Sequence, residues 1–173
     1  MIPFINAERV ADYIARRLKW YVLEYAGKEA GIVGVSGGAD SAVTAYLTVR
    51  ALGPEKTYCY VLPSRATPRE DVEDALEVIR RLEIPESNWE VIPIDSIVES
   101  FERALGKMTR IERGNAMARI RMTILHQRAY RHNGLVVGTG DKSELLIGYF
   151  TKYGDGGVDV LPMGGSTRLM LGS

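Results

Sequence analysis

The stretch GIVGVSGGADSAV occupies residues 31–43, and its character changes twice within this short distance. Apolar, β-branched residues predict a strand. A serine and two glycines interrupt them, and an Ala/Val/Leu-rich run then predicts a helix over 42–52. A strand, a tight glycine loop and a helix in this order are typical of a phosphate site, because glycine allows close approach and a helix N-terminus attracts anions. No G-K-[ST] sequence follows, so the loop is not a Walker A motif.

Three polar side chains predict what this loop binds. Ser36 and Ser41 offer hydroxyl donors to a phosphate. Asp40 has the same sign of charge as a phosphate, so we expect it to hold a magnesium ion between itself and the phosphates. The alternative is that the glycine pair only makes a turn, but a plain turn requires neither the flanking strand and helix nor the two serines.

Length and composition favour one domain over residues 1–173 that acts on a small molecule. Hydrophobic residues make up 46% of the chain, and 22 basic residues balance 22 acidic ones, which argues against nucleic acid or an anionic membrane as partner. The single cysteine, Cys59, excludes an internal disulfide, and its apolar neighbours predict a buried strand residue rather than a nucleophile. Neither a signal peptide nor a long apolar run is found, so we expect a soluble, cytoplasmic protein.

Strand and helix patterns alternate along the rest of the chain. Further strands are expected over 57–62, 88–94 and 135–140, and helices over 7–26, 68–82, 95–105, 110–133 and 141–150. Thr67 is the expected N-cap of its helix, with Pro68 at the first helical position. This alternation predicts an α/β fold, a doubly wound parallel sheet with helices on both faces.

Ligands bind such sheets at the carboxyl ends of the strands. Arg65 and Arg69 follow strand 57–62 at this edge, where they either face a ligand or are solvated loop arginines. Glu144 follows strand 135–140. If that strand neighbours the first one, Glu144 and Asp40 reach the same crevice and can share a magnesium ion.

The helix over 110–133 has two apolar stripes, which need two partners. One stripe comprises Ala118, Met122, Leu125 and Ala129, and the other comprises Met117, Ile120 and Ile124. One stripe can pack on the sheet of its own chain, and the other can pack against the same helix of a second copy, which predicts a homodimer. The alternative is that both stripes are buried within one subunit.

Four blocks, taken in order, closely resemble ammonia-dependent NAD synthetase, a family of N-type ATP pyrophosphatases. The blocks are SGGADS at 36–41, GNAMARIRM at 114–122, GTGDKSEL at 138–145 and FTKYGDGGVD at 150–159. The resemblance runs from about residue 5 to Pro162, whereas the first block alone would also fit GMP synthetase or a tRNA-thiolating enzyme. It implies the adenine nucleotide alpha hydrolase-like fold of the ATP pyrophosphatases.

The resemblance also implies an activity. Such a ligase amidates deamido-NAD with ammonia and ATP, giving NAD, AMP and pyrophosphate through an adenylated intermediate. ATP as co-substrate, Mg2+ and a homodimer are further implications. The lone cysteine lies in a strand, so nothing resembles a glutaminase, and we expect ammonia to arrive free.

Carried over by position, the family's functional residues fall on all four blocks. The implied ATP contacts are Gly34, Val35, Ser36, Gly37, Gly38, Ala39, Asp40, Ser41, Thr139 and Arg168. The implied magnesium ligands are Asp40 and Glu144, and the implied deamido-NAD contacts are Arg119, Lys152 and Asp159. Asp40 and Lys152 are the expected catalytic residues, because adenylation needs positive charge where negative charge grows on the α-phosphate.

The resemblance weakens after Pro162, where family members continue into further active-site loops and helices. Arg168 stands where the family usually has a lysine. We therefore expect a C-terminally truncated form that binds ATP, with amidation of deamido-NAD much reduced or undetectable. One alternative is a nucleotide-binding module without turnover. Another is an ATP pyrophosphatase with a different acceptor, such as xanthosine monophosphate or a tRNA base, which would need a basic face or an acceptor domain.

Overall fold

The computed structural model describes residues 6–140 and 151–163, and a four-stranded parallel sheet lies at its centre. The strands are β1 (Ala30–Gly34), β2 (Thr57–Val61), β3 (Trp89–Val91) and β4 (Gly134–Val136). They pair in the order β3-β2-β1-β4, so β4 neighbours β1, as the magnesium hypothesis requires. The strand order reverses at β1, which is where open α/β sheets bind ligands.

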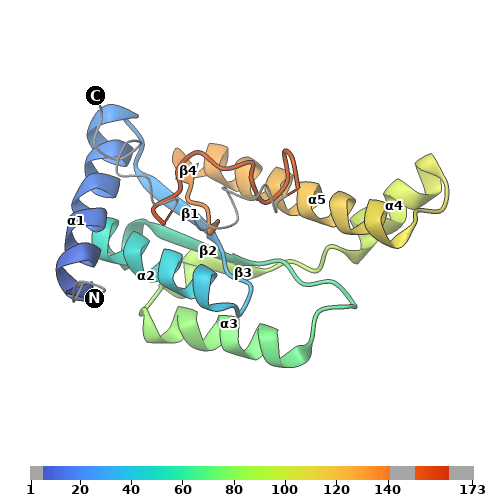
Figure 1. The fold of residues 1–173 in the computed structure, drawn as a ribbon, viewed down its shortest axis with the longest axis horizontal. Coiled ribbons are helices and arrows are strands. Elements are labelled where there is room, and N and C mark those ends of the chain that lie inside the picture. Colours follow the sequence, from blue (N-terminus) through green and yellow to red (C-terminus); the bar gives the residue numbers. More distant parts are fainter. Residues whose placement is uncertain (1–5, 141–150, 164–173) are drawn as a thin grey trace, which may run out of the picture.

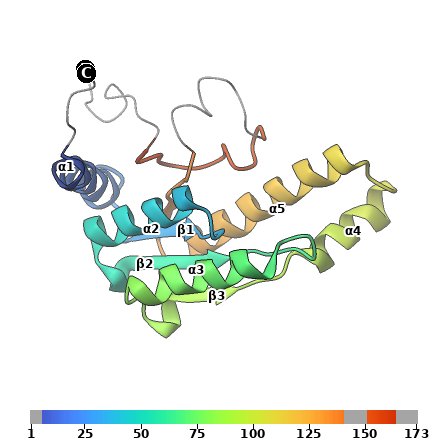
Figure 2. The same cartoon turned by 60° about the horizontal axis from the view of Figure 1, so that its bottom comes forward.

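Helices cover both faces of the sheet. They are α1 (Ala7–Lys19), α2 (Ala39–Leu52), α3 (Arg69–Arg81), α4 (Asp95–Leu105) and α5 (Arg110–Arg131), together with the short turns η1 (Trp20–Tyr25), η2 (Pro54–Lys56) and η3 (Glu86–Asn88). Figures 1 and 2 show α2 and α3 over one face and α5 over the other, with α4 and the start of α5 projecting beyond the sheet. The predicted doubly wound α/β arrangement is confirmed. Within residues 6–140 and 151–163, no helix is both long and apolar enough to cross a membrane.

Alternate residues of the central strands divide the core in two. Val33 and Cys59 pack with Ile79 of α3 on one face, whereas Ile32 packs with Ile120 of α5 on the other. Both faces of the sheet are therefore buried. This explains why the strands read as continuous apolar runs rather than as alternating patterns.

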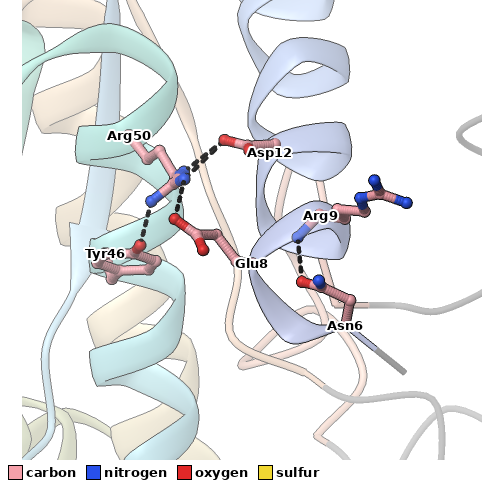
Figure 3. A network of polar contacts seen from close by, with 6 residues as sticks. All are labelled: Asn6, Glu8, Arg9, Asp12, Tyr46 and Arg50. Carbon is pink, nitrogen blue, oxygen red and sulfur yellow. Dashed lines mark hydrogen bonds and ion pairs between the residues drawn. The ribbon is translucent and has the colours of Figure 1, made fainter. Parts of the chain in front are cut away.

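Helix α1 packs against α2 through a buried seam and a polar network at its edge. Ala15 and Leu18 of α1 are buried. Arg50 of α2 donates from Nε and Nη2 to Oδ1 of Asp12, at 2.9 and 2.7 Å, and from Nη1 to the hydroxyl of Tyr46 (Figure 3). This network is exposed, so it orients α1 while contributing little to stability.

The last turn of the helix predicted over 7–26 is wider than expected. It is the π-helical η1, in which the Ala26 N–H donates to the Tyr21 carbonyl five residues back, at 2.9 Å. The rings of Tyr21 and Tyr25 stack with their centroids 5.3 Å apart. The apolar repeat that predicted the helix is insensitive to this local widening.

Three other predicted boundaries are wrong. Thr67 does not cap α3, because Pro68 takes the N-cap position and the Thr67 hydroxyl instead accepts a hydrogen bond from the Ser64 N–H, at 3.0 Å. The loop thus satisfies Thr67 before the helix begins. The strands predicted over 88–94 and 135–140 are shorter, Trp89–Val91 and Gly134–Val136.

Both apolar stripes of α5 have partners in the same chain. Ile120 is buried in the sheet core, and Ile124 packs beside it. On the other stripe, Ala118 and Met122 lie against the glycine-rich segment, which we define as residues 151–159. The prediction that one stripe is left for a second copy is therefore wrong, because the glycine-rich segment occupies that place.

Candidate functional site

The loop between β1 and α2 requires glycine at one of its two glycine positions. Gly37 has a φ of +90°, a conformation that residues with a Cβ rarely adopt, and a Cβ there would overlap the backbone oxygen of Asp71 in α3. Gly38 has a φ of −75°, and a Cβ there would meet only Ser36 Oγ, at 3.5 Å. Gly37 therefore serves the fold, whereas the open surface of Gly38 is available to a ligand.

Ser36 and Ser41 fix the loop from inside. The N–H and the hydroxyl of Ser36 both donate to Ser41 Oγ, at 3.1 and 3.2 Å, and the Ser41 hydroxyl donates to the Gly38 carbonyl at 2.8 Å. Ser41 is buried, whereas Ser36 is exposed. The Ser41 hydroxyl is thus engaged within the loop, and its predicted contact with a phosphate stays a prediction.

The N-terminus of α2 presents backbone donors at the end of this loop. Its N-cap, Gly38, makes no side-chain capping bond, and the first N–H groups of an α-helix have no partner within the helix. Ala39 and Asp40 are exposed here, and the 14-residue helix directs the positive end of its dipole to the same point. The arrangement suits an anion, and the Asp40 carboxylate is an oxygen donor of the kind that Mg2+ prefers.

A cavity of about 590 Å³ adjoins the loop, at the carboxyl ends of β1, β2 and β4. This volume suits a nucleotide-sized ligand. Four of the implied ATP contacts line it, namely Gly34, Val35, Ser36 and Thr139. The far wall consists of α5 and the glycine-rich segment. The hollow edge of the sheet is therefore the edge that the sequence predicted.

The two arginines after β2 point away from this cavity to ion-pair partners. Arg65 lies 2.9 Å from Glu99, and Arg69 lies 2.7 Å from Glu73. Both arginine side chains are largely exposed. Of the two alternatives, the solvated one is confirmed, although only Arg65 lies in the loop and Arg69 is the first residue of α3.

Arg121 lines the cavity instead, and sequence reasoning missed it. Its Nε donates to the Leu62 carbonyl at the end of β2, at 2.9 Å. Burial lowers the pKa of the guanidinium, against the opposing effect of the Asp95 carboxylate. Arg119 and Arg121 are two positions apart and so point to nearly opposite sides of α5. That spacing was the available signal that one of the two arginines faces inward.

The three implied deamido-NAD contacts lie outside the cavity lining, on or beside the glycine-rich segment. Arg119 is exposed on α5, and its Nε donates to the Lys152 carbonyl at 3.2 Å. Lys152 is also exposed, with its ammonium 5.1 Å from the centre of the Tyr153 ring. Asp159 lies at the other end of the segment, where Oδ2 accepts the Val136 N–H at 2.8 Å. Arg119 and Lys152 are thus adjacent, and Asp159 is anchored to β4.

Two implied site residues lie outside the described residues: Glu144, with the short helix predicted around it, and Arg168. The shared magnesium site and the last ATP contact therefore stay predictions. In the part of the chain that the structure describes, no group of three or more His, Cys, Asp or Glu side chains is placed to hold a metal.

Cys59 is not a nucleophile. It is fully buried in β2, and this burial raises the pKa of its thiol to about 12. Near neutral pH the side chain is therefore a protonated, apolar core residue, as predicted.

The same architecture is found in known proteins. The family model for NAD synthase matches residues 10–169. The chain belongs to the NAD synthase family. The resemblance noted in the sequence is thereby confirmed.

Among members of the NAD synthase family, the NH3-dependent NAD+ synthetase of Saccharolobus solfataricus is 48% identical over 160 residues, which cover 92% of this chain and 56% of that protein. The chain thus spans little more than half the length of this curated relative.

Two solved structures have the same fold, each with a TM-score of 0.86. One is the NH3-dependent NAD synthetase of Campylobacter jejuni with a nitrate ion, 32% identical, covering 95% of this chain and 69% of that one. The other is NMN synthetase from Francisella tularensis, 34% identical, covering 96% and 68%.

Proposed function

We propose that this chain binds ATP through the β1–α2 loop and takes part in the ammonia-dependent amidation of deamido-NAD to NAD. The observation that carries the proposal is the uncapped N-terminus of α2 beside a nucleotide-sized cavity. Membership of the NAD synthase family supports the choice of reaction. The part of the relatives that this chain does not match would supply other parts of the site.

In the proposed reaction, a carboxylate oxygen of deamido-NAD attacks the α-phosphorus of ATP and pyrophosphate leaves. The ammonia nitrogen then attacks the carboxyl carbon of this adenylate, and AMP leaves with the bridging oxygen. Free ammonia is the proposed nitrogen donor, as in the name of the Saccharolobus solfataricus relative, and Cys59 itself is too deeply buried and too weakly acidic to release ammonia from glutamine.

We assign the chain's residues to these steps as follows. The N–H groups at the start of α2 hold the pyrophosphate, and Ser36 and Thr139 contact ATP from the cavity wall. Lys152 supplies positive charge near the α-phosphate, while Arg119 and Asp159 hold deamido-NAD.

Two more residues with assigned roles, Arg168 and Glu144, lie outside the described part of the structure. Arg168 is assigned a contact with ATP. Asp40 and Glu144 would hold a magnesium ion, which when bound neutralises charge on the phosphates.

Calorimetry with ATP and Mg2+, followed by an assay for NAD from deamido-NAD and ammonium, tests the proposal. ATP binding with NAD formation supports it. ATP binding with no AMP or NAD would favour the module without turnover. A chimaera with the unmatched remainder of the Saccharolobus solfataricus relative shows whether that remainder restores turnover. Absence of ATP binding by both this chain and the chimaera would refute the proposal.

A second candidate acceptor is nicotinate mononucleotide. The observation that favours it is the likeness to NMN synthetase, at a TM-score of 0.86 and 34% identity. Both acceptors carry the same carboxylate and differ in the adenylyl half. A comparison of kcat/KM for the two acceptors at equal ATP and ammonium discriminates between them, and we expect deamido-NAD to be preferred.

We also propose that the chain forms a homodimer through the projecting α4–α5 end. Phe101, Leu105 and Ile111 are exposed there, at 43, 76 and 77% of their surface. A cluster of large apolar side chains on a projecting element is typical of an interaction surface. A second copy is the proposed partner, because most oligomers of soluble enzymes are symmetric and use one patch twice.

We further propose that the protein acts in the cytoplasm, where ATP, its proposed co-substrate, is present.

A further inference from the structure

The glycine-rich segment is joined to α5 by three side chains from different turns of the helix. Asn115 Oδ1 accepts a hydrogen bond from the Thr151 hydroxyl at 3.0 Å. Arg119 Nε donates to the Lys152 carbonyl at 3.2 Å. His126 Nε2 lies 2.8 Å from the Gly157 carbonyl, seven residues further along the helix from Arg119. The two ends of the segment are therefore both tied to α5.

His126 makes the contact that fixes the far end. A carbonyl oxygen can only accept, so Nε2 must carry the hydrogen and donate it to Gly157. The other ring nitrogen, Nδ1, lies 4.0 Å from Oδ2 of Asp159. That same oxygen accepts the Val136 N–H of β4 at 2.8 Å. His126 thus sits between the segment's backbone and the carboxylate of an implied substrate contact.

The segment lies so close to α5 that its glycines leave no room for side chains. A Cβ on Gly154 would lie 2.9 Å from the Cβ of Ala118, and a Cβ on Gly157 would lie 3.0 Å from Cγ of Met122. Glycine is intrinsically the most mobile residue, so a segment rich in it needs external contacts to keep one shape. The polar contacts from α5 provide them, together with the packing of Val158 against the core.

We propose that His126 is a positioning residue that fixes the glycine-rich segment and so places Lys152 and Asp159 for the acceptor nucleotide. The assignment of the acceptor rests on the proposed function. The contact itself does not, because it joins two parts of this chain. Binding of inorganic pyrophosphate should be independent of His126, since we assign pyrophosphate to the β1–α2 loop. The hydrogen bonds within this loop join Ser36, Gly38 and Ser41, none of which belongs to α5 or the segment.

Three variants test the positioning role. His126→Ala removes the donor, and His126→Gln keeps an N–H donor on a side chain of similar reach. Gln127→Ala is the matched control, because Gln127 is the exposed neighbour on the same turn of α5. Should His126→Ala fail to fold, the comparison of His126→Gln with the control still decides.

The first measurement is hydrogen exchange of the segment without any ligand. The N–H groups of Gly154, Gly157 and Asp159 are hydrogen-bonded to the carbonyls of Thr151, Gly154 and Val136, so they report its order. We expect these amides to exchange about tenfold faster in His126→Ala than in the control, with partial recovery in His126→Gln. Equal exchange in His126→Ala and the control would overturn the proposal.

The second measurement compares the affinities for deamido-NAD and for inorganic pyrophosphate, which reports on the β1–α2 loop. Loss of one positioning hydrogen bond should raise the Kd for deamido-NAD about three- to tenfold and leave the Kd for inorganic pyrophosphate unchanged. Equal weakening of both ligands, or no weakening of either, would overturn the positioning role. If the wild-type chain binds no deamido-NAD, the proposed function fails for this chain, and the exchange experiment alone decides whether His126 orders the segment.

Discussion

Gly37 and Gly38 are adjacent in the sequence yet have different physical duties. Gly37 combines a positive φ with direct contact to the backbone of Asp71, whereas Gly38 has an ordinary φ and open space around it. Sequence reasoning treats the pair as one feature, because it cannot see α3 packing against one of them.

Gly37→Ala should therefore destabilise the fold far more than Gly38→Ala. We expect a loss of roughly 1–3 kcal/mol from the backbone conformation alone, with the clash against Asp71 adding to it. Gly38→Ala should stay within about 0.5 kcal/mol, as at other unstrained exposed positions. Urea unfolding of the two variants and the wild type measures the difference. Equal losses would contradict the distinction.

Asp40→Asn should remove the magnesium-dependent part of ATP binding without disturbing the fold. Asp40 is exposed, so the substitution should change the unfolding free energy of the protein by no more than about 0.5 kcal/mol. Because a ligand that binds the native state raises its stability, thermal shift with MgATP reports the binding. We expect the shift to fall to the value seen with ATP alone, together with loss of pyrophosphate release. An unchanged dependence on magnesium would exclude Asp40 as a ligand.

At the scale of elements, the C-terminal end of α5 carries a histidine whose charge the fold opposes. His132 stacks on Tyr58, with the ring centroids 3.8 Å apart, and Nε2 lies 3.1 Å from the Tyr60 hydroxyl. Burial, followed by the charges of Arg131 and Arg128, lowers the pKa of His132 below its usual 6.5. A neutral imidazole is therefore favoured in the folded protein.

This shift predicts a loss of stability in mild acid. The unfolded chain binds a proton at His132 more readily than the folded chain does. The contribution of His132 to the free energy of unfolding is therefore fully present above pH 6.5 and is lost as the pH falls towards the pKa of the folded state. His132→Phe keeps an aromatic ring on Tyr58 and should flatten the decrease in unfolding free energy between pH 7.5 and 5.5. Urea unfolding at several pH values in this range tests the prediction. An identical dependence of the unfolding free energy on pH in the wild type and the variant would contradict it.

Several elements could be predicted because local patterns determine them. The β1–α2 unit is marked by an apolar run, a pair of glycines and a run of residues that favour helix. Helix α4 was predicted with the bounds that the structure shows, Asp95–Leu105. The fate of an apolar stripe could not be predicted. Met122 lies against Gly157, which is distant from it in the chain, and a pattern within one helix carries no information about which distant segment covers it.

The same limit applies to the candidate site. Composition and spacing predicted the β1–α2 loop and the hollow carboxyl edge of the sheet, since both depend on neighbours in sequence. Arg121 and His126 escaped notice because their partners, the carbonyls of Leu62 and Gly157, are backbone atoms that no residue type reveals.

At the scale of the whole molecule, the projecting α4–α5 end predicts the state of assembly. Ile111→Lys should convert a dimer to a monomer while the fold is kept, because Ile111 is 77% exposed and supports no core. Sedimentation equilibrium at micromolar concentration measures the mass, and circular dichroism confirms the fold. Val43→Lys, at an exposed apolar position on α2, is the control. A wild-type monomer, or equal effects of both changes, would refute the assignment of this surface.

The sheet order also sets a sequence of events for the nascent chain. β1 pairs with β2, which follows it closely, and also with β4, in the register Ala30 with Gly134, after most of the chain has intervened. Closing so long a loop is slow, so the β1–β2–β3 half should assemble before β4 and α5 dock. In pulse-labelled refolding, we expect amides of β4 to gain protection after those of β2. The cavity is lined by both halves, so the capacity to hold a nucleotide should be the last property to emerge during folding.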